Sequence, residues 1–128
     1  MRYLIDTHVL IWYLDGDDRL PQRLKEELNN ENNTVIVSVV SLFEIAIKLT
    51  KIDKVKFKVT LPQIEAHLLE MDFLLIGIHF NHLHTLITLP TQHGDPFDRL
   101  LIAQAIAENL TLVSVDRQFK NYSVNLLS

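Results

Sequence analysis

Five acidic residues stand at the carboxyl ends of expected strands or near the starts of the helices that follow: Asp6, Glu44, Asp95, Asp98 and Asp116. In a sheet of parallel strands these positions converge on one edge, where ligands bind. Carboxylates brought together repel one another, and a bound cation removes that cost. Oxygen ligands without cysteine suit Mg²⁺ or Mn²⁺, which activate water and stabilise the transition state of phosphodiester hydrolysis. The pattern therefore predicts a metal-dependent phosphodiester hydrolase.

Each acid also has a structural interpretation. Ser41 and Glu44 have the spacing of a helix capping box, and Asp95 is suited to cap the helix that follows it. Asp116 is suited to begin a turn. Asp6 is the hardest to explain structurally, because aspartate is disfavoured at the end of an apolar strand unless it has a partner. The metal interpretation therefore depends on the acids taken jointly.

The elements expected to position these acids alternate between strand and helix. Expected strands cover residues 3–5, 34–38, 73–78, 110–115 and 124–127. Expected helices cover residues 8–14, 21–30, 41–51, 62–71, 80–88 and 96–109. Strands separated by helices indicate right-handed crossovers and a mostly parallel sheet. The strands are continuous apolar runs, as expected of strands covered on both faces.

Length and composition bound the class of protein. The chain has 128 residues, 48% of them apolar, which fits one domain with its own core, residues 1–128. Its 12 basic and 16 acidic residues give a net charge of −4, which argues against a generally basic nucleic-acid binder. The absence of cysteine excludes disulfides and thiolate zinc sites. No segment has the form of a membrane span or a signal peptide, so we expect a cytoplasmic protein with no membrane partner.

Three segments resemble the PIN domain family, and more narrowly the VapC-type toxins of bacterial type II toxin–antitoxin modules. They are LIDTHVLIW at residues 4–12, SLFEIAIK at 41–48 and HGDPFDRLLIAQAIAENLTLVSVD at 93–116. The resemblance runs in order over nearly the whole chain. It implies one α/β domain of three layers, with a central, mostly parallel sheet of about five strands flanked by helices. It also implies a divalent-metal-dependent endoribonuclease.

The resemblance assigns roles to the acids. Its catalytic, metal-binding positions fall on Asp6, Glu44, Asp98 and Asp116, with Mg²⁺ or Mn²⁺ as the implied ion. Asp95 is either a further metal ligand or only a helix cap. The resemblance also implies a cognate antitoxin, whose tail covers the active site, and a homodimer. Two alternatives stay open: a non-cleaving PIN-like scaffold that binds RNA or protein, and a receiver-like, magnesium-binding signalling module.

Four further residues near the acids are candidates for contact with RNA. Lys48 and Lys51 belong to a segment, residues 48–58, that holds five Lys and one Asp and is either a phosphate-binding patch or a solvated face. Arg99 has the planar group that binds a phosphate or pairs with an acid. The Thr7 hydroxyl is suited to hold a phosphate or to cap the helix that follows, and we expect the cap.

Three large apolar side chains lie on helices expected near the same sheet edge. Trp12, Phe43 and Ile47 exceed what a small domain obviously needs inside. We expect them in the core. The alternative is a surface for self-association and for the antitoxin.

Overall fold

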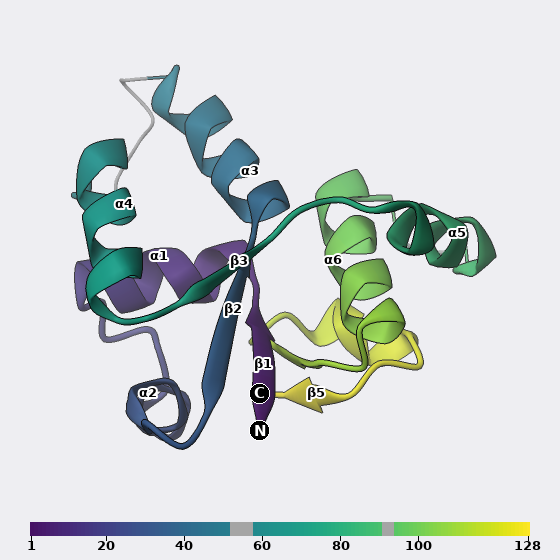
Figure 1. The fold of residues 1–128 in the computed structure, drawn as a ribbon, viewed down its shortest axis with the longest axis horizontal. Coiled ribbons are helices and arrows are strands. Elements are labelled where there is room, and N and C mark those ends of the chain that lie inside the picture. The colour runs from purple at the N-terminus through teal and green to yellow at the C-terminus, as the bar shows by residue number, and fades with distance from the viewer. Residues whose placement is uncertain (52–57, 91–93) are drawn as a thin grey trace.

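A parallel β-sheet runs through the centre of the molecule in a computed structural model that describes residues 1–51, 58–90 and 94–128 (Figure 1). The strands are β1 (Arg2–Ile5), β2 (Thr34–Ser38), β3 (Leu74–Ile76), β4 (Thr111–Val113) and β5 (Leu126–Leu127). Their order across the sheet is β3-β2-β1-β4-β5, and every neighbouring pair is parallel. The expected α/β fold with a parallel sheet of five strands is confirmed.

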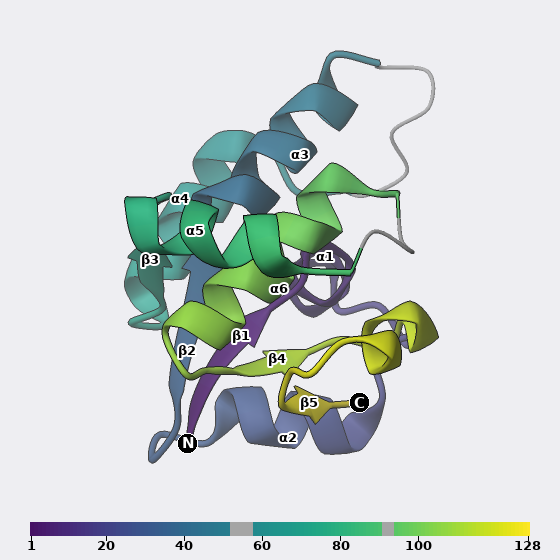
Figure 2. The same cartoon turned by 90° about the vertical axis from the view of Figure 1, so that its right-hand side faces the viewer.

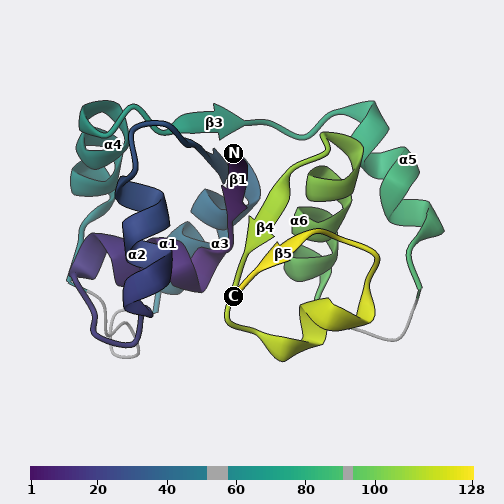
Figure 3. The ribbon, with the colours of Figure 1, turned by 90° about the horizontal axis from the view of Figure 1, so that it is seen from below.

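Helices cover both faces of the sheet. They are α1 (Thr7–Asp15), α2 (Gln22–Asn29), α3 (Val39–Leu49), α4 (Leu61–Glu70), α5 (Phe80–Thr88) and α6 (Pro96–Ala107), followed by the 3₁₀ helix η2 (Arg117–Asn121). Figures 1 and 3 show α1, α2 and α4 on one side, with α5 and α6 on the other. The sheet is therefore the middle of three layers. Among the described residues, no helix combines the length and apolar character needed to cross a membrane.

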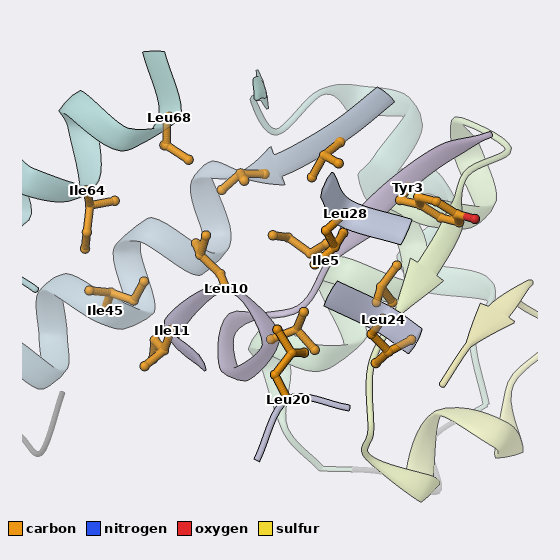
Figure 4. Close-up of a cluster of buried hydrophobic side chains, with 14 residues drawn as sticks. Tyr3, Ile5, Leu10, Ile11, Leu20, Leu24, Leu28, Ile45, Ile64 and Leu68 are labelled. Carbon is orange, nitrogen blue, oxygen red and sulfur yellow. The ribbon is translucent and has the colours of Figure 1, made fainter. Parts of the chain in front are cut away.

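Alternating residues of β1 divide the core into two halves. Tyr3 and Ile5 belong to a cluster with residues of α1, α2 and α4, which Figure 4 shows in close-up. Leu4 belongs to the opposite cluster, which α6 supplies. Leu4 and Ile5 are both fully buried, and burying such a side chain stabilises a fold by roughly 1.5–3 kcal/mol. Packing on both faces thus fixes the carboxyl end of β1, after which the first acid follows.

Helix α3 follows β2 without a loop. It begins at Val39 rather than at the expected residue 41. Ser38, the last residue of β2, caps it, because the Val40 N–H donates to Ser38 Oγ (3.0 Å). The same hydroxyl donates to Oε1 of Gln104 on α6 (2.6 Å). Strand β2 and helices α3 and α6 therefore meet at one buried serine.

Strand β3 differs from the expected strand at 73–78. It is shorter, and it lies at the edge of the sheet, where Leu74 and Leu75 are 54% and 56% exposed. The expectation that every strand is covered on both faces is therefore wrong for β3.

The C-terminal part also departs from the expectation in detail. Strand β4 ends at Val113, and the short helix η2, which the sequence did not predict, begins at Arg117. At the other end of the chain, Pro21 is the residue before α2 rather than its first residue.

Candidate active site

Asp6 lies directly after β1 and is held from two sides. One oxygen, Oδ1, accepts a hydrogen bond from the Val9 N–H (2.8 Å), so Asp6 caps α1. The other, Oδ2, accepts a hydrogen bond from the hydroxyl of Ser114. The residue is 4% exposed. Asp6 therefore has a structural role that the sequence analysis did not predict: it caps α1. This role fixes the orientation of its carboxylate.

The surroundings of Asp6 disfavour its negative charge. The pKa of the Asp6 carboxyl is raised from 3.8 to about 6, and burial is the largest cause. The hydrogen bonds from Ser114 and Val9 lower it, whereas the negative charges of Asp116 and Glu44 raise it. Three carboxylates thus interact at one edge of the sheet, and a cation bound there would favour their ionised forms.

Thr7 connects this edge to α3. Its hydroxyl donates to Oε1 of Glu44 (2.7 Å) and lies 3.1 Å from the hydroxyl oxygen of Ser41. Thr7 is the first residue of α1 and is 3% exposed. The expectation that Thr7 caps the helix is wrong, because Asp6 occupies the cap. The buried hydroxyl instead positions the Glu44 carboxylate.

Glu44 lies in the second turn of α3 rather than the first, because the helix begins at Val39. The predicted capping box of Ser41 and Glu44 is therefore wrong, since Ser38 is the cap. The other Glu44 oxygen, Oε2, lies 3.7 Å from Nζ of Lys48, one turn further along. Glu44 is thus free of any capping role and its carboxylate lies between Thr7 and a lysine.

Ser114 joins Asp6 to Asp116. Its hydroxyl oxygen accepts the N–H of Asp116 (3.0 Å) while the hydroxyl donates to Asp6. Asp116 in turn accepts the Gln118 N–H at Oδ1 (2.9 Å) and caps η2, so its predicted role at the start of a turn is confirmed. The sequence prediction did not include Ser114. Its signal was a polar residue in an apolar strand segment, two residues before an acid.

Asp95 and Asp98 occupy the start of α6. Asp95 Oδ1 accepts the N–H groups of Phe97 (2.9 Å) and Asp98 (3.2 Å), which confirms the predicted helix cap. Asp98 lies in the first turn. The rings of Phe97 and Phe43 meet edge to face with centroids 6.0 Å apart. This contact brings the start of α6 against the part of α3 that carries Glu44, the residue after Phe43.

The donor set suits a hard divalent ion in its chemistry, because it is built of carboxylate and hydroxyl oxygens. Electrostatics couple Asp6 with Glu44 and Asp116, whereas Asp95 and Asp98 lie on the neighbouring helix. Within residues 1–51, 58–90 and 94–128, no three acidic or histidine side chains are already grouped to hold one ion. The site is therefore an assembly of oriented carboxylates rather than a complete coordination shell.

The candidate RNA contacts have different surroundings. Arg99 donates from Nη1 to the Pro90 carbonyl and lies 3.4 Å from the Tyr122 hydroxyl. Lys48 lies beside Glu44, and Lys51 is exposed. Most of the lysine-rich segment, residues 52–57, lies outside the described residues.

The apolar side chains near the site divide between interior and surface. Trp12 and Ile47 are half-buried, and the Arg19 guanidinium lies over the Trp12 ring, 5.2 Å from its centroid. Phe43 is 60% exposed, so its expected place in the core is wrong. The exposed Phe43 ring, which contacts Phe97, forms an apolar surface next to the acids.

Comparison with known proteins gives a consistent result. The model of the PIN domain family matches residues 3–125. Ribonuclease VapC22 of Mycobacterium tuberculosis (strain ATCC 25618 / H37Rv) is 27% identical over 124 residues, which cover 93% of this chain and 90% of that protein.

Two solved structures share the fold. One is VapBC2 from Rickettsia felis bound to a DNA fragment from their promoter, with a TM-score of 0.73 and 22% identity over 99% of this chain and 98% of that chain. The other is a toxin–antitoxin complex from Klebsiella pneumoniae, with a TM-score of 0.66 and 18% identity over 98% and 96% of the two chains. With the family match extending over nearly its whole length, this chain belongs to the PIN domain family.

Proposed function

We propose that this PIN domain protein is a divalent-metal-dependent endoribonuclease and the toxin of a type II toxin–antitoxin module. One observation carries the proposal: the buried Asp6 carboxyl, with its pKa raised to about 6, interacts with the carboxylates of Glu44 and Asp116. A bound cation would favour the ionised form of such a carboxyl group more than that of an ordinary exposed one. The relative in Mycobacterium tuberculosis is named a ribonuclease, which supports RNA as the substrate.

In this proposal Asp6, Glu44, Asp98 and Asp116 are the catalytic residues and hold Mg²⁺ or Mn²⁺. Asp95 serves as the cap of α6 and is the fifth candidate ligand. A bound divalent ion activates water and offsets charge on the phosphoryl group.

The neighbouring hydroxyls keep the carboxylates in place. Thr7 orients Glu44, and Ser114 orients Asp6 while also accepting the Asp116 N–H. Outer partners of this kind fix the direction of ligand oxygens, and their loss typically reduces metal affinity by roughly 10–100-fold. The chain thus contributes oriented oxygens and excludes solvent from Asp6.

RNA contacts are proposed at Lys48, Lys51 and Arg99. Lys48 lies beside Glu44, and Arg99 follows Asp98 directly in the first turns of α6. We do not propose a direct contact between Thr7 and RNA, because the Thr7 hydroxyl is buried against Glu44.

The proposed protein partners are a cognate antitoxin and a second copy of the chain. The two structural relatives are described as toxin–antitoxin assemblies. On this chain, large apolar side chains stay exposed along α3, α4, β3 and α5, among them Phe43, Leu69, Leu75, Phe80 and Ile87. Exposed apolar surface of this kind marks protein interaction sites. We propose that the protein acts on RNA in the cytoplasm. We also propose that residues 1–128 form a single domain.

Cleavage of a panel of structured RNAs with Mg²⁺ or Mn²⁺ tests the proposal. Asp98→Asn keeps the shape of the side chain and removes its charge, and we expect it to lower cleavage by at least the roughly 10–100-fold that loss of an outer partner of a metal ligand costs. Asp18→Asn, at an exposed acid outside the site, is the matched control and should cleave as the wild type does. Equal cleavage by the wild type and Asp98→Asn contradicts the site assignment.

The alternatives give different outcomes. Absence of metal-dependent cleavage for every RNA, with RNA or protein binding retained, would favour the non-cleaving scaffold. Membership of the PIN family removes the receiver-like module.

A further inference from the structure

A small basic pocket lies beside Asp116. Its volume is about 200 Å³. Its lining includes Arg23 of α2 and Arg117 and Lys120 of η2, together with Asp116 and Ser128. In Figure 2, η2 is the yellow helical turn near the C-terminal end of the chain. The pocket therefore adjoins an acid of the candidate active site, to which Ser114 links the buried Asp6.

The three cations of this pocket are available to a ligand. All three are exposed. In the described part of the chain, none of them has an acidic partner within 4.0 Å, the terminal carboxylate included. By contrast, Arg19 is paired with Asp17 (2.7 Å) and Lys48 lies 3.7 Å from Glu44. On a chain of net charge −4, this pocket gathers three cations beside one acidic side chain, Asp116, and the last residue, Ser128.

The size and charge of the pocket indicate the class of ligand. Sites for whole small molecules usually measure roughly 300–1,000 Å³, so about 200 Å³ suits a smaller group. Arginine binds phosphate through a planar fork, and lysine binds it as a point charge. A single phosphate group matches both features.

We propose that Arg23, Arg117 and Lys120 bind a backbone phosphate of the RNA strand, different from the phosphate that is cleaved. This inference rests on the proposed function, since it places the substrate strand across Asp116 toward η2. The phosphate seat formed by these three residues acts on substrate position: it draws the strand to the edge where the carboxylates stand and fixes the side from which it enters. It would explain how an acidic protein binds a polyanion next to its own acids.

RNA binding, measured apart from cleavage, tests the phosphate seat. Fluorescence anisotropy of a labelled single-stranded oligoribonucleotide of about twelve nucleotides, in EDTA and over a series of salt concentrations, reports phosphate binding. For Arg117→Gln and for Lys120→Gln we expect weaker binding, about 3–10-fold at low salt, and a salt slope that is smaller by roughly 0.7 for each phosphate-binding cation removed. Lys25→Gln removes the same charge from an exposed position of α2 outside the pocket, and it should change binding less than about 2-fold.

Cleavage kinetics separate positioning from chemistry. The Arg117→Gln/Lys120→Gln variant should raise KM for RNA by a larger factor than it lowers kcat, because the phosphate seat binds a phosphate other than the one that is cleaved. Arg117→Lys should restore most of the RNA affinity that Arg117→Gln removes. Thermal melting of each variant should match the wild type, because all three side chains are exposed.

The outcomes separate this inference from the proposed function. Reduced RNA binding in the Gln variants, without cleavage by the wild type, supports the phosphate seat and contradicts the nuclease. Metal-dependent cleavage with RNA binding and salt slope unchanged in the Gln variants overturns the phosphate seat and keeps the nuclease. Unchanged RNA binding combined with abolished binding of an oligoglutamate peptide assigns the pocket to an acidic protein segment and also overturns the proposal.

Discussion

The hydroxyl of Ser114 donates to the carboxylate of Asp6 across 108 residues of sequence. The two residues follow neighbouring strands, β4 and β1, whose register sets Val113 beside Ile5. Because the same hydroxyl oxygen accepts the Asp116 N–H, one serine orients two of the proposed ligands. The geometry of the site therefore depends on the pairing of these strands as much as on the acids.

Replacing Ser114 with alanine should weaken metal binding while keeping the fold. The hydrogen bond from Ser114 lowers the pKa of Asp6, so its loss should raise that pKa further. We expect roughly 10–100-fold lower affinity for Mn²⁺ by calorimetry, with a matching rise in the metal concentration needed for RNA cleavage. Ser123→Ala, at an exposed serine, is the control. Unchanged affinity in Ser114→Ala would mean that Asp6 does not bind the ion.

Thr7→Val tests the orientation of Glu44. Valine has nearly the shape of threonine but leaves Glu44 Oε1 without its donor at 2.7 Å. We expect cleavage to fall by roughly 10–100-fold and unfolding to become easier by about 1–3 kcal/mol. Thr7→Ser keeps the hydroxyl and should retain most of the activity. Cleavage by Thr7→Val equal to that of the wild type would show that the hydrogen bond to Glu44 does not support activity.

Asp6→Asn should stabilise the metal-free protein above neutral pH and abolish cleavage. The folded-state pKa of Asp6 is raised, so the stability linked to its protonated form is fully present below pH 3.8 and is lost as pH rises through about 6. The difference corresponds to roughly 3 kcal/mol. Asparagine caps helices as well as aspartate does.

Urea unfolding in EDTA checks this prediction. At a pH of about 7.5 Asp6→Asn should be the more stable protein, and its advantage should shrink as pH falls from about 6 to about 4. Mg²⁺ or Mn²⁺ should stabilise the wild type and leave the variant unchanged. A wild type more stable than the variant at the higher pH without metal would contradict the assigned pKa direction.

Local sequence signals predicted the parts of the fold that depend on neighbouring residues. Strand β2 has the expected bounds, and Asp95 caps α6 as its sequence context indicated. The predicted start of α3 was wrong because Val39 and Val40 are β-branched and favour strand. In the structure the residue before them, Ser38, is held by a buried contact to Gln104, 66 residues away.

The site was predictable in its acids but not in its supports. Acid type and position predicted five candidate ligands, of which three interact electrostatically in the structure. Thr7 and Ser114 reach their partners across 37 and 108 residues. Contacts over such distances leave no local periodicity, so only the folded sheet brings them together. The exposure of Phe43 was likewise set by where α3 and α6 meet.

The junction at Ser38 has no loop that could accommodate an inserted residue. Because β2 passes into α3 through one residue that is both the end of the strand and the helix cap, any inserted residue would turn the whole helix by about 100°. Glu44 would then leave the side of α3 that faces Thr7. The spacing of six residues between Ser38 and Glu44 is therefore a dimension of the site itself.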